Sequence, residues 1–172
     1  GNPGLLWTPI VDEDYLPMQP VVDSISPQAK DIPLLIGTAM TEWTTMGMLQ
    51  DAGKYRSDNK NTWSEEETSA KLKERFGERT EQIVEAFRKA YPGRPIAEAL
   101  YIDTMLRLPA LKTARLKADQ HGAPVYNYMF AWDTPIEGGF AMSYHCSELA
   151  FVFDNIAMSK ASEAGGKEAQ EL

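Results

Sequence analysis

The chain has 172 residues, 43% of them hydrophobic and 10% aromatic, which is enough for one hydrophobic core and well above the range of disordered chains. Its formal net charge of −8 argues against a nucleic-acid partner, because phosphates require clustered positive charge. No apolar run reaches membrane-spanning length, and the first residues lack the pattern of a signal peptide. The single cysteine, Cys146, cannot form an internal disulfide, which favours a reducing compartment. We therefore expect a cytoplasmic protein without a membrane partner, unless a signal peptide preceding residue 1 has been lost.

The first third of the chain predicts loops around one strand. Five prolines within residues 1–30 indicate extended loop with a short helical turn. The apolar run 32–36 lacks polar alternation and predicts a buried parallel strand. The polar, glycine-containing stretch 50–61 predicts a mobile loop.

Helical patterns follow from residue 64 onwards. Ser64-x-x-Glu67 predicts a capping box at the start of a helix that ends at Gly77. A second apolar repeat predicts a helix that Pro92-Gly93 stops.

A third helix is predicted to open at Pro95, to kink or restart at Pro109 and to run to about Gln120. His121-Gly122 is predicted to be its C-terminal cap, a structural role for this histidine.

A second buried strand is predicted over Val125 to Trp132, which is apolar, aromatic and bounded by prolines. A loop with Gly138-Gly139 follows and delivers His145. This is where α/β-hydrolases keep their general base, although a lone loop histidine is often just a surface residue. The small, charged tail after Met158 predicts a frayed helix.

Four segments carry a family resemblance. In the order of the chain they are Trp7-x-Pro9-x-Val11-Asp12 with Leu16-Pro17; Asp31-x-Pro33-Leu34-Leu35-Ile36-Gly37 followed by Glu42; Asp103-x-x-Leu106-x-x-Pro109-Ala110; and Tyr126-x-Tyr128-x-Phe130 followed by His145-x-x-Glu148-Leu149-x-Phe151-Val152-Phe153. Together they resemble type-B carboxylesterases, the para-nitrobenzyl-esterase and cholinesterase-like family. The chain departs from the family pattern at Glu13 and Trp43, where glycine is usual, and at Leu106, where phenylalanine is commoner.

The resemblance implies the C-terminal part of an α/β-hydrolase fold, with few parallel strands and a helical excursion between them, cut at both ends. Residues 1–62 would hold the acid-bearing strand and loops, 63–122 the helical excursion, and 123–172 the last strand, histidine loop and tail. The family's nucleophile is a serine in G-x-S-x-G, which does not occur here. Ser24 and Ser143 lack the flanking glycines.

The resemblance also assigns roles. Glu42 would be the triad acid and His145 the general base. Glu148 would secure the backbone near His145 without taking part in proton transfer. Apart from the resemblance, the apolar side chains beside Glu42 suggest a substrate pocket lined by Trp43 and Met46, with Met48 and Leu49, although aromatic and methionine residues are more often part of a core. No metal or organic cofactor is implied.

Several alternatives to these roles are weaker. The other candidate acids, each also readable as a turn or cap residue, are Asp31, Asp133 and Asp154. A dyad of Cys146 with His145 is disfavoured because adjacent side chains generally point apart. The acidic triplet 12–14 lacks the ligand spacing of a calcium loop and predicts a solvated turn.

The sequence therefore predicts a fragment of a serine carboxylesterase that acts on small-molecule esters and is inactive alone. The alternative is a non-catalytic, esterase-like interaction domain, against which the presence of both Glu42 and His145 counts. Two strands leave unpaired edges, so we expect the N-terminal part of the same protein, or a homo-oligomer or swapped assembly, to complete the sheet.

Overall fold

The computed structural model describes residues 10–19, 21 and 23–172, apart from the side chains of residues 47–50. Trp7 and Pro9, two residues of the first family segment, lie outside the described residues. The chain divides into two compact units, Gly1–Gly37 with Leu108–Tyr128 and Thr38–Arg107 with Met129–Leu172.

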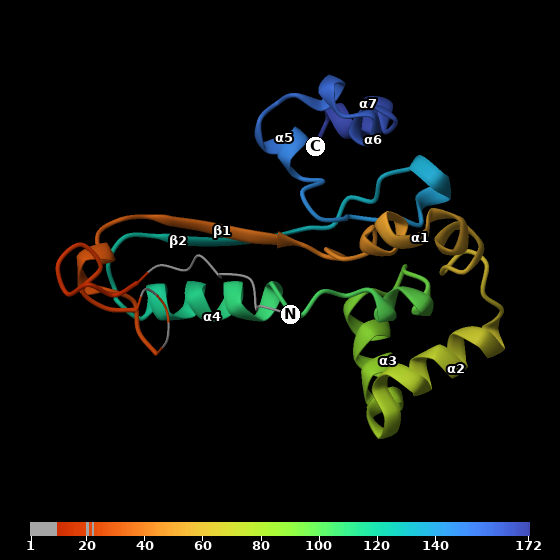
Figure 1. Ribbon diagram of the computed structural model, residues 1–172, viewed down its shortest axis with the longest axis horizontal. Helices are drawn as coiled ribbons and strands as arrows, with labels where there is room; N and C mark the ends of the chain where they lie inside the picture. The colour runs from red at the N-terminus through yellow and green to blue at the C-terminus, as the bar shows by residue number, and fades with distance from the viewer. Residues whose placement is uncertain (1–9, 20, 22) are drawn as a thin grey trace, which may run out of the picture. The chain divides into compact units, whose positions relative to one another are not determined.

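A parallel pair of strands, β1 (Leu34–Ala39) and β2 (Val125–Phe130), forms the sheet among the described residues (Figure 1). The Leu34 N–H donates to the Pro124 carbonyl at 3.1 Å, and the Met40 N–H donates to the Phe130 carbonyl at 2.8 Å. From the first of these bonds to the second, each strand advances by six residues toward its C-terminal end. The two strands therefore run parallel. Both predicted strands form, but the prediction that they are buried is wrong for this chain, because Leu35 is 70% exposed and Tyr126 is 60% exposed. β1 begins after Pro33, because proline has no N–H for the ladder.

In the first unit, helix α4 (Arg107–Ala118) runs alongside the strand pair (Figure 1). Its end is tied to the loop before β1, because the Lys117 ammonium donates to the Lys30 carbonyl at 2.8 Å. His121 adopts a positive φ of 50°, and its N–H donates to the Ala118 carbonyl at 3.0 Å, so it ends the helix as predicted. The short 3₁₀ turn η1 (Pro27–Ala29) is the helical turn expected in this region.

The acidic triplet forms a solvated turn, as predicted. Asp12 Oδ1 accepts the N–H groups of Asp14 at 3.1 Å and Leu16 at 2.8 Å. These bonds from the backbone of Leu16 and Asp14 lower the pKa of the exposed Asp12 carboxyl.

The second unit is built on a helical cluster with a small hydrophobic core. Its elements are α1 (Met46–Ser57), α2 (Glu65–Phe76), η2 (Gly77–Arg79), α3 (Thr80–Ala90) and η3 (Ile96–Leu100). The buried core residues are Met40, Leu72, Phe87 and Ala99. The predicted capping box is present, since Ser64 Oγ accepts the Glu67 N–H and the Glu67 carboxylate accepts the Ser64 N–H.

The mobile loop predicted for residues 50–61 is wrong, because most of this stretch belongs to helix α1. The helix breaks at Asp51, whose φ of −151° is not helical. Asp51 Oδ1 then accepts the Lys54 N–H at 3.0 Å, which restarts the helix. The polar composition reflects exposure of this segment and not a lack of regular structure.

The third helix, predicted to open at Pro95 and to kink or restart at Pro109, forms only in part. Only η3 forms after Pro95, and the helix begins anew at Arg107. The cause is Asp103, whose carboxylate accepts the N–H groups of Met105, Leu106 and Arg107 at 2.8–3.3 Å. This carboxylate satisfies the backbone donors where α4 begins. Pro109 lies in the first turn of α4, where its missing N–H needs no partner.

The C-terminal region, which follows β2 in the chain, is a series of short helices and 3₁₀ turns. Its elements are η4 (Ile136–Gly139), α5 (Leu149–Val152), η5 (Ile156–Met158), α6 (Lys160–Glu163) and α7 (Gly166–Gln170). Thr134 Oγ1 donates to the Ala161 carbonyl at 2.8 Å, and Trp132 packs so closely on Gly165 that a Cβ there would overlap its ring. The helical tail is thus anchored after β2. Across the described residues, no helix is both long and apolar enough to cross a membrane.

We expect Gly37→Ala to destabilise the protein, because a Cβ at residue 37 would overlap the Tyr128 ring on the neighbouring strand. Overpacking of this kind typically costs about 1–3 kcal/mol. Gly93→Ala is the matched control, since a Cβ there meets nothing within 4 Å. Urea unfolding of both variants measures the difference. Equal stability of the two would show that Tyr128 does not pack on Gly37.

Candidate functional site

Two loops that follow the parallel strands are joined by hydrogen bonds. We name them the acid loop (residues 40–45, after β1) and the histidine loop (residues 139–148, after β2). Parallel strands end at the same edge of a sheet, which brings their following loops together. Thr41 donates to the Ser143 carbonyl from its N–H at 3.3 Å and from Oγ1 at 3.1 Å. Thr44 Oγ1 lies 2.6 Å from the Ala141 carbonyl oxygen, to which it donates.

Glu42 and His145 form the central contact between these loops. Glu42 Oε2 lies 2.6 Å from Nδ1 of His145, across 103 residues of sequence. The backbone N–H of His145 also donates to the Glu42 carbonyl at 2.9 Å. The other carboxylate oxygen, Oε1, accepts the Ala39 N–H at 2.7 Å. The structure therefore brings together the two residues to which the resemblance assigns the acid and base roles, and the carboxylate is fixed at both oxygens.

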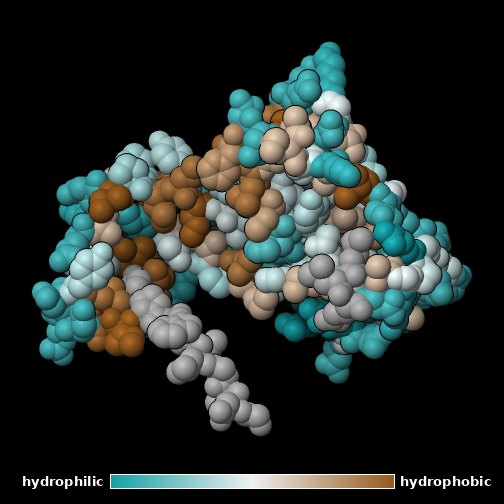
Figure 2. Space-filling model, turned by 45° about the horizontal axis from the view of Figure 1, so that its top comes forward, coloured by the Kyte–Doolittle hydropathy of each residue, from teal (hydrophilic) through white to brown (hydrophobic). Residues whose placement is uncertain are grey.

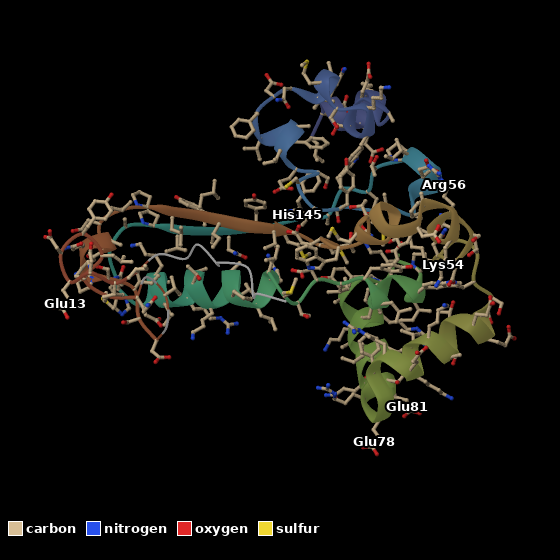
Figure 3. The ribbon with its side chains drawn as sticks, in the orientation of Figure 1. Glu13, Lys54, Arg56, Glu78, Glu81 and His145 are labelled. Carbon is tan, nitrogen blue, oxygen red and sulfur yellow. The ribbon has the colours of Figure 1, made fainter. Side chains whose placement is uncertain are left out.

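The two partners differ in exposure. The Glu42 side chain is 5% exposed and that of His145 is 49% exposed. His145 belongs to the histidine loop after β2 and lies near the end of β1 (Figure 3). Because a carboxylate is an acceptor, the contact assigns the proton to Nδ1 and leaves the Nε2 lone pair free to accept. An oriented imidazole with an accessible Nε2 can serve as a general base.

The backbone of the histidine loop adopts left-handed conformations on both sides of His145. Met142 has φ of 51° and Cys146 has φ of 66°, and neither is glycine. Such residues each cost about 1–3 kcal/mol and persist only where the surroundings fix them. The hydrogen bonds from Thr44 to the Ala141 carbonyl and from Thr41 to the Ser143 carbonyl hold the backbone on either side of Met142.

Trp43 packs against the imidazole of His145. The two rings are stacked, with centroids 5.4 Å apart and an interplanar angle of 17°. The indole Nε1–H donates to Asp103 Oδ1 at 3.0 Å. Trp43 also lines a cavity of about 320 Å³, whose other walls are Thr44, Arg75, Leu100, Tyr101, Ile102, Asp103, Thr104 and Met105.

The other pocket residues predicted with Trp43 do not line this cavity. Met46 is 42% exposed and is not among the residues around it. The side chains of Met48 and Leu49 lie outside the described part of the structure. A pocket role for Met46 stays a prediction.

Glu148 lies three residues after His145, at the start of α5. Its backbone carbonyl accepts the N–H groups of Phe151 and Val152, both at 3.0 Å. Its Oε2 atom is buried and has no hydrogen-bond partner among the described residues. The predicted role of Glu148 in securing the backbone near His145 stays a prediction.

The alternative acids are occupied elsewhere or exposed. Asp133 pairs with Arg94 at 2.7 Å, and burial raises the pKa of its carboxyl despite that neighbour. Asp31 and Asp154 are exposed. Glu42 is the carboxylate that contacts Nδ1.

Cys146 is a free, exposed thiol beside His145. Partial loss of hydration at its sulfur raises the pKa of the thiol, and the nearby carboxylates of Glu148 and Glu42 raise it further. A raised pKa disfavours the nucleophilic thiolate, which agrees with setting the Cys-His dyad aside.

Sequence reasoning did not find Thr41 and Thr44, which join the two loops. Threonine is ordinary in loops, and only the presence of two threonines beside Glu42 could have drawn attention to them. Within the described part of the chain, no group of three or more metal-binding side chains is found.

A parallel strand pair that carries an acid after one strand and a histidine after the other defines part of an α/β-hydrolase. Residues 1–171 match the sequence model of the carboxylesterase family, and the chain belongs to that family. The resemblance to type-B carboxylesterases and the predicted fold class are thus confirmed.

Two relatives illustrate the match. The chain is 30% identical over 152 residues to the para-nitrobenzyl esterase of Bacillus subtilis (strain 168). The matched segment covers 88% of this chain and 28% of that protein. The structure of this chain resembles that of an esterase from anaerobic Clostridium hathewayi that can hydrolyse aliphatic aromatic polyesters. The TM-score is 0.68, and the sequences are 30% identical. The match covers 80% of this chain and 26% of that one. The chain spans about a quarter of the length of these relatives.

We expect Thr41→Val to destabilise the protein by about 1–3 kcal/mol, because it removes a buried donor to the Ser143 carbonyl. Thr38→Val is the matched control. Thr38 is also buried, but its Oγ1 has no hydrogen-bond partner in the described part of the structure, so the change should be neutral or stabilising. Urea unfolding compares the two variants. Equal losses would mean that the Thr41 hydroxyl does not hold the loops together.

Proposed function

We propose that this chain supplies the acid and the general base of a serine carboxylesterase. The observation that carries the proposal is the 2.6 Å contact between Glu42 Oε2 and His145 Nδ1, in a chain of the carboxylesterase family. A non-catalytic interaction domain has no need of a buried carboxylate that orients an accessible imidazole.

The proposed reaction begins with a serine hydroxyl outside these 172 residues. His145 Nε2 removes its proton as the serine oxygen attacks the ester carbonyl carbon. The imidazolium then gives that proton to the leaving alcohol, which forms the acyl-enzyme. In the second half, Nε2 takes a proton from water, the hydroxide attacks the acyl carbon, and the proton returns to the serine as the carboxylic acid departs.

Glu42 remains ionised throughout this cycle. Its buried position and its bond from the Ala39 N–H keep the carboxylate aimed at Nδ1. It therefore holds the imidazole in the tautomer that leaves Nε2 free and stabilises the imidazolium that forms in each half-reaction. No metal or organic cofactor takes part in the proposed steps.

The cavity beside Trp43 supports esters with an apolar group as the substrate class. Leu100, Ile102 and Met105 supply apolar walls next to the residue that stacks on His145. The named activities of the two relatives, on para-nitrobenzyl esters and on aliphatic aromatic polyesters, agree with this class.

We expect the purified 172-residue chain to leave para-nitrophenyl esters unhydrolysed above background, and co-expression with the serine-bearing segment to give turnover. His145→Ala should then lower kcat by roughly 10³-fold or more, because triad members act as a unit. His121→Ala is the control, since the remaining histidine lies at a helix end and should leave the rate within about twofold. Serine-type activity from the isolated chain, or full activity of His145→Ala, would contradict the proposal.

We also propose that the strand pair is completed by the serine-bearing part of the same protein or by another copy of this chain. Leu35 is 70% exposed and Tyr126 is 60% exposed, on the two strands of the sheet. Apolar surface of this kind interrupts the hydrophilic exterior (Figure 2). Strands with apolar exposed positions and unpaired edges favour association.

Sedimentation of the purified chain at micromolar concentration tests this association. We expect species larger than a monomer, which the serine-bearing segment should convert to a defined heterodimer if it is the natural partner. A single monomeric species with cooperative unfolding would show that the strand pair needs no completion.

A further inference from the structure

We propose that Trp43 is a positioning residue that fixes the plane of the His145 imidazole. This inference rests on the proposed function of His145, but its geometry stands independently. Glu42 holds the ring at one atom, Nδ1. A single contact at one ring atom leaves the imidazole free to rock about that bond, and the half-exposed side chain has little packing on its solvent side to stop it.

The indole of Trp43 removes this freedom. Its ring is nearly parallel to the imidazole, with an interplanar angle of 17° and a centroid separation of 5.4 Å, within the range of favourable aromatic pairs. The carboxylate thus holds the imidazole at its edge and the indole holds it at its face. Two restraints in different directions define where Nε2 points.

Trp43 is itself held rigidly through Asp103. The indole N–H donates to Asp103 Oδ1 at 3.0 Å, and the Asp103 N–H donates to the Met40 carbonyl at 2.9 Å. Asp103 is 4% exposed, and its two carboxylate oxygens also accept the backbone N–H groups where α4 begins. The indole is therefore anchored to a buried carboxylate that has no freedom to turn.

The stacking also places an aromatic face against the charge that forms in the reaction. When the imidazole takes the serine proton, the resulting cation lies over the indole, the aromatic ring most favourable for a cation. The position after the acid thus carries a side chain that both orients the base and faces its charged form.

Proton NMR of the purified 172-residue chain tests the stack without any catalysis. The chain has two histidines, so His121 is an internal reference. The ring carbon protons of His145 should lie upfield of those of His121 because of the indole ring current. Trp43→Leu should abolish this shift, and Trp43→Phe should retain part of it. Unchanged His145 resonances in Trp43→Leu would overturn the stack.

Kinetics of the assembled enzyme, the chain with its serine-bearing segment, test the positioning role. Trp43→Leu should lower kcat about tenfold to a hundredfold with KM nearly unchanged, since a small misplacement of a reacting group has costs of that size. Trp43→Phe, which keeps a ring but loses the bond to Asp103, should recover part of the rate. A rise in KM with kcat unchanged would make Trp43 a pocket wall and overturn the role. Failure of the proposed function is distinguishable from failure of this role, because full activity of the His145→Ala variant would contradict the function of His145 itself.

Discussion

The parallel pairing of β1 with β2 is the constraint on which the site depends. The ends of the two strands are 90 residues apart in sequence, but the Met40 N–H donates a hydrogen bond of 2.8 Å to the Phe130 carbonyl. The acid loop and the histidine loop leave the sheet from these ends. A change of pairing by one residue would turn every side chain of a strand to the opposite face. The position of Glu42 relative to His145 is thus set by the strand register before any contact between their side chains.

Polar bonds between the loops then refine this placement. Thr41 and Thr44 donate to backbone carbonyls of the histidine loop, and the Glu42 carbonyl accepts the His145 N–H. All three groups belong to one short segment, so the acid loop also shapes the histidine loop. Burial of Thr41, Glu42 and Thr44 strengthens these bonds, because water does not compete for them.

Local patterns in the sequence were sufficient for the strands, the capping box at Ser64 and the helix end at His121. Glu42 and His145 were found from family motifs, and the order of the strands indicated that they would be close together. The prediction of a helix from Pro95 was only partly right because apolar periodicity does not reveal that the Asp103 carboxylate binds backbone donors three and four residues ahead. The helical part of 50–61 was missed because residues 51–57 are mostly polar and exposed and show no apolar repeat. The stack of Trp43 on His145 could not be predicted from spacing, since it depends on side-chain orientations in two loops.

The positive φ angles of Met142 and Cys146 have a consequence for the order in which the protein folds. Residues other than glycine disfavour this backbone conformation, so the histidine loop rarely adopts it in the unfolded chain. Its supporting bonds come from residues about a hundred positions earlier, and contacts of such separation form only after a large loss of chain entropy. We therefore expect the histidine loop to acquire its native shape late, once β1 and β2 have paired. The contact between Glu42 and His145 is then a property of the nearly complete fold, and partly folded chains lack it.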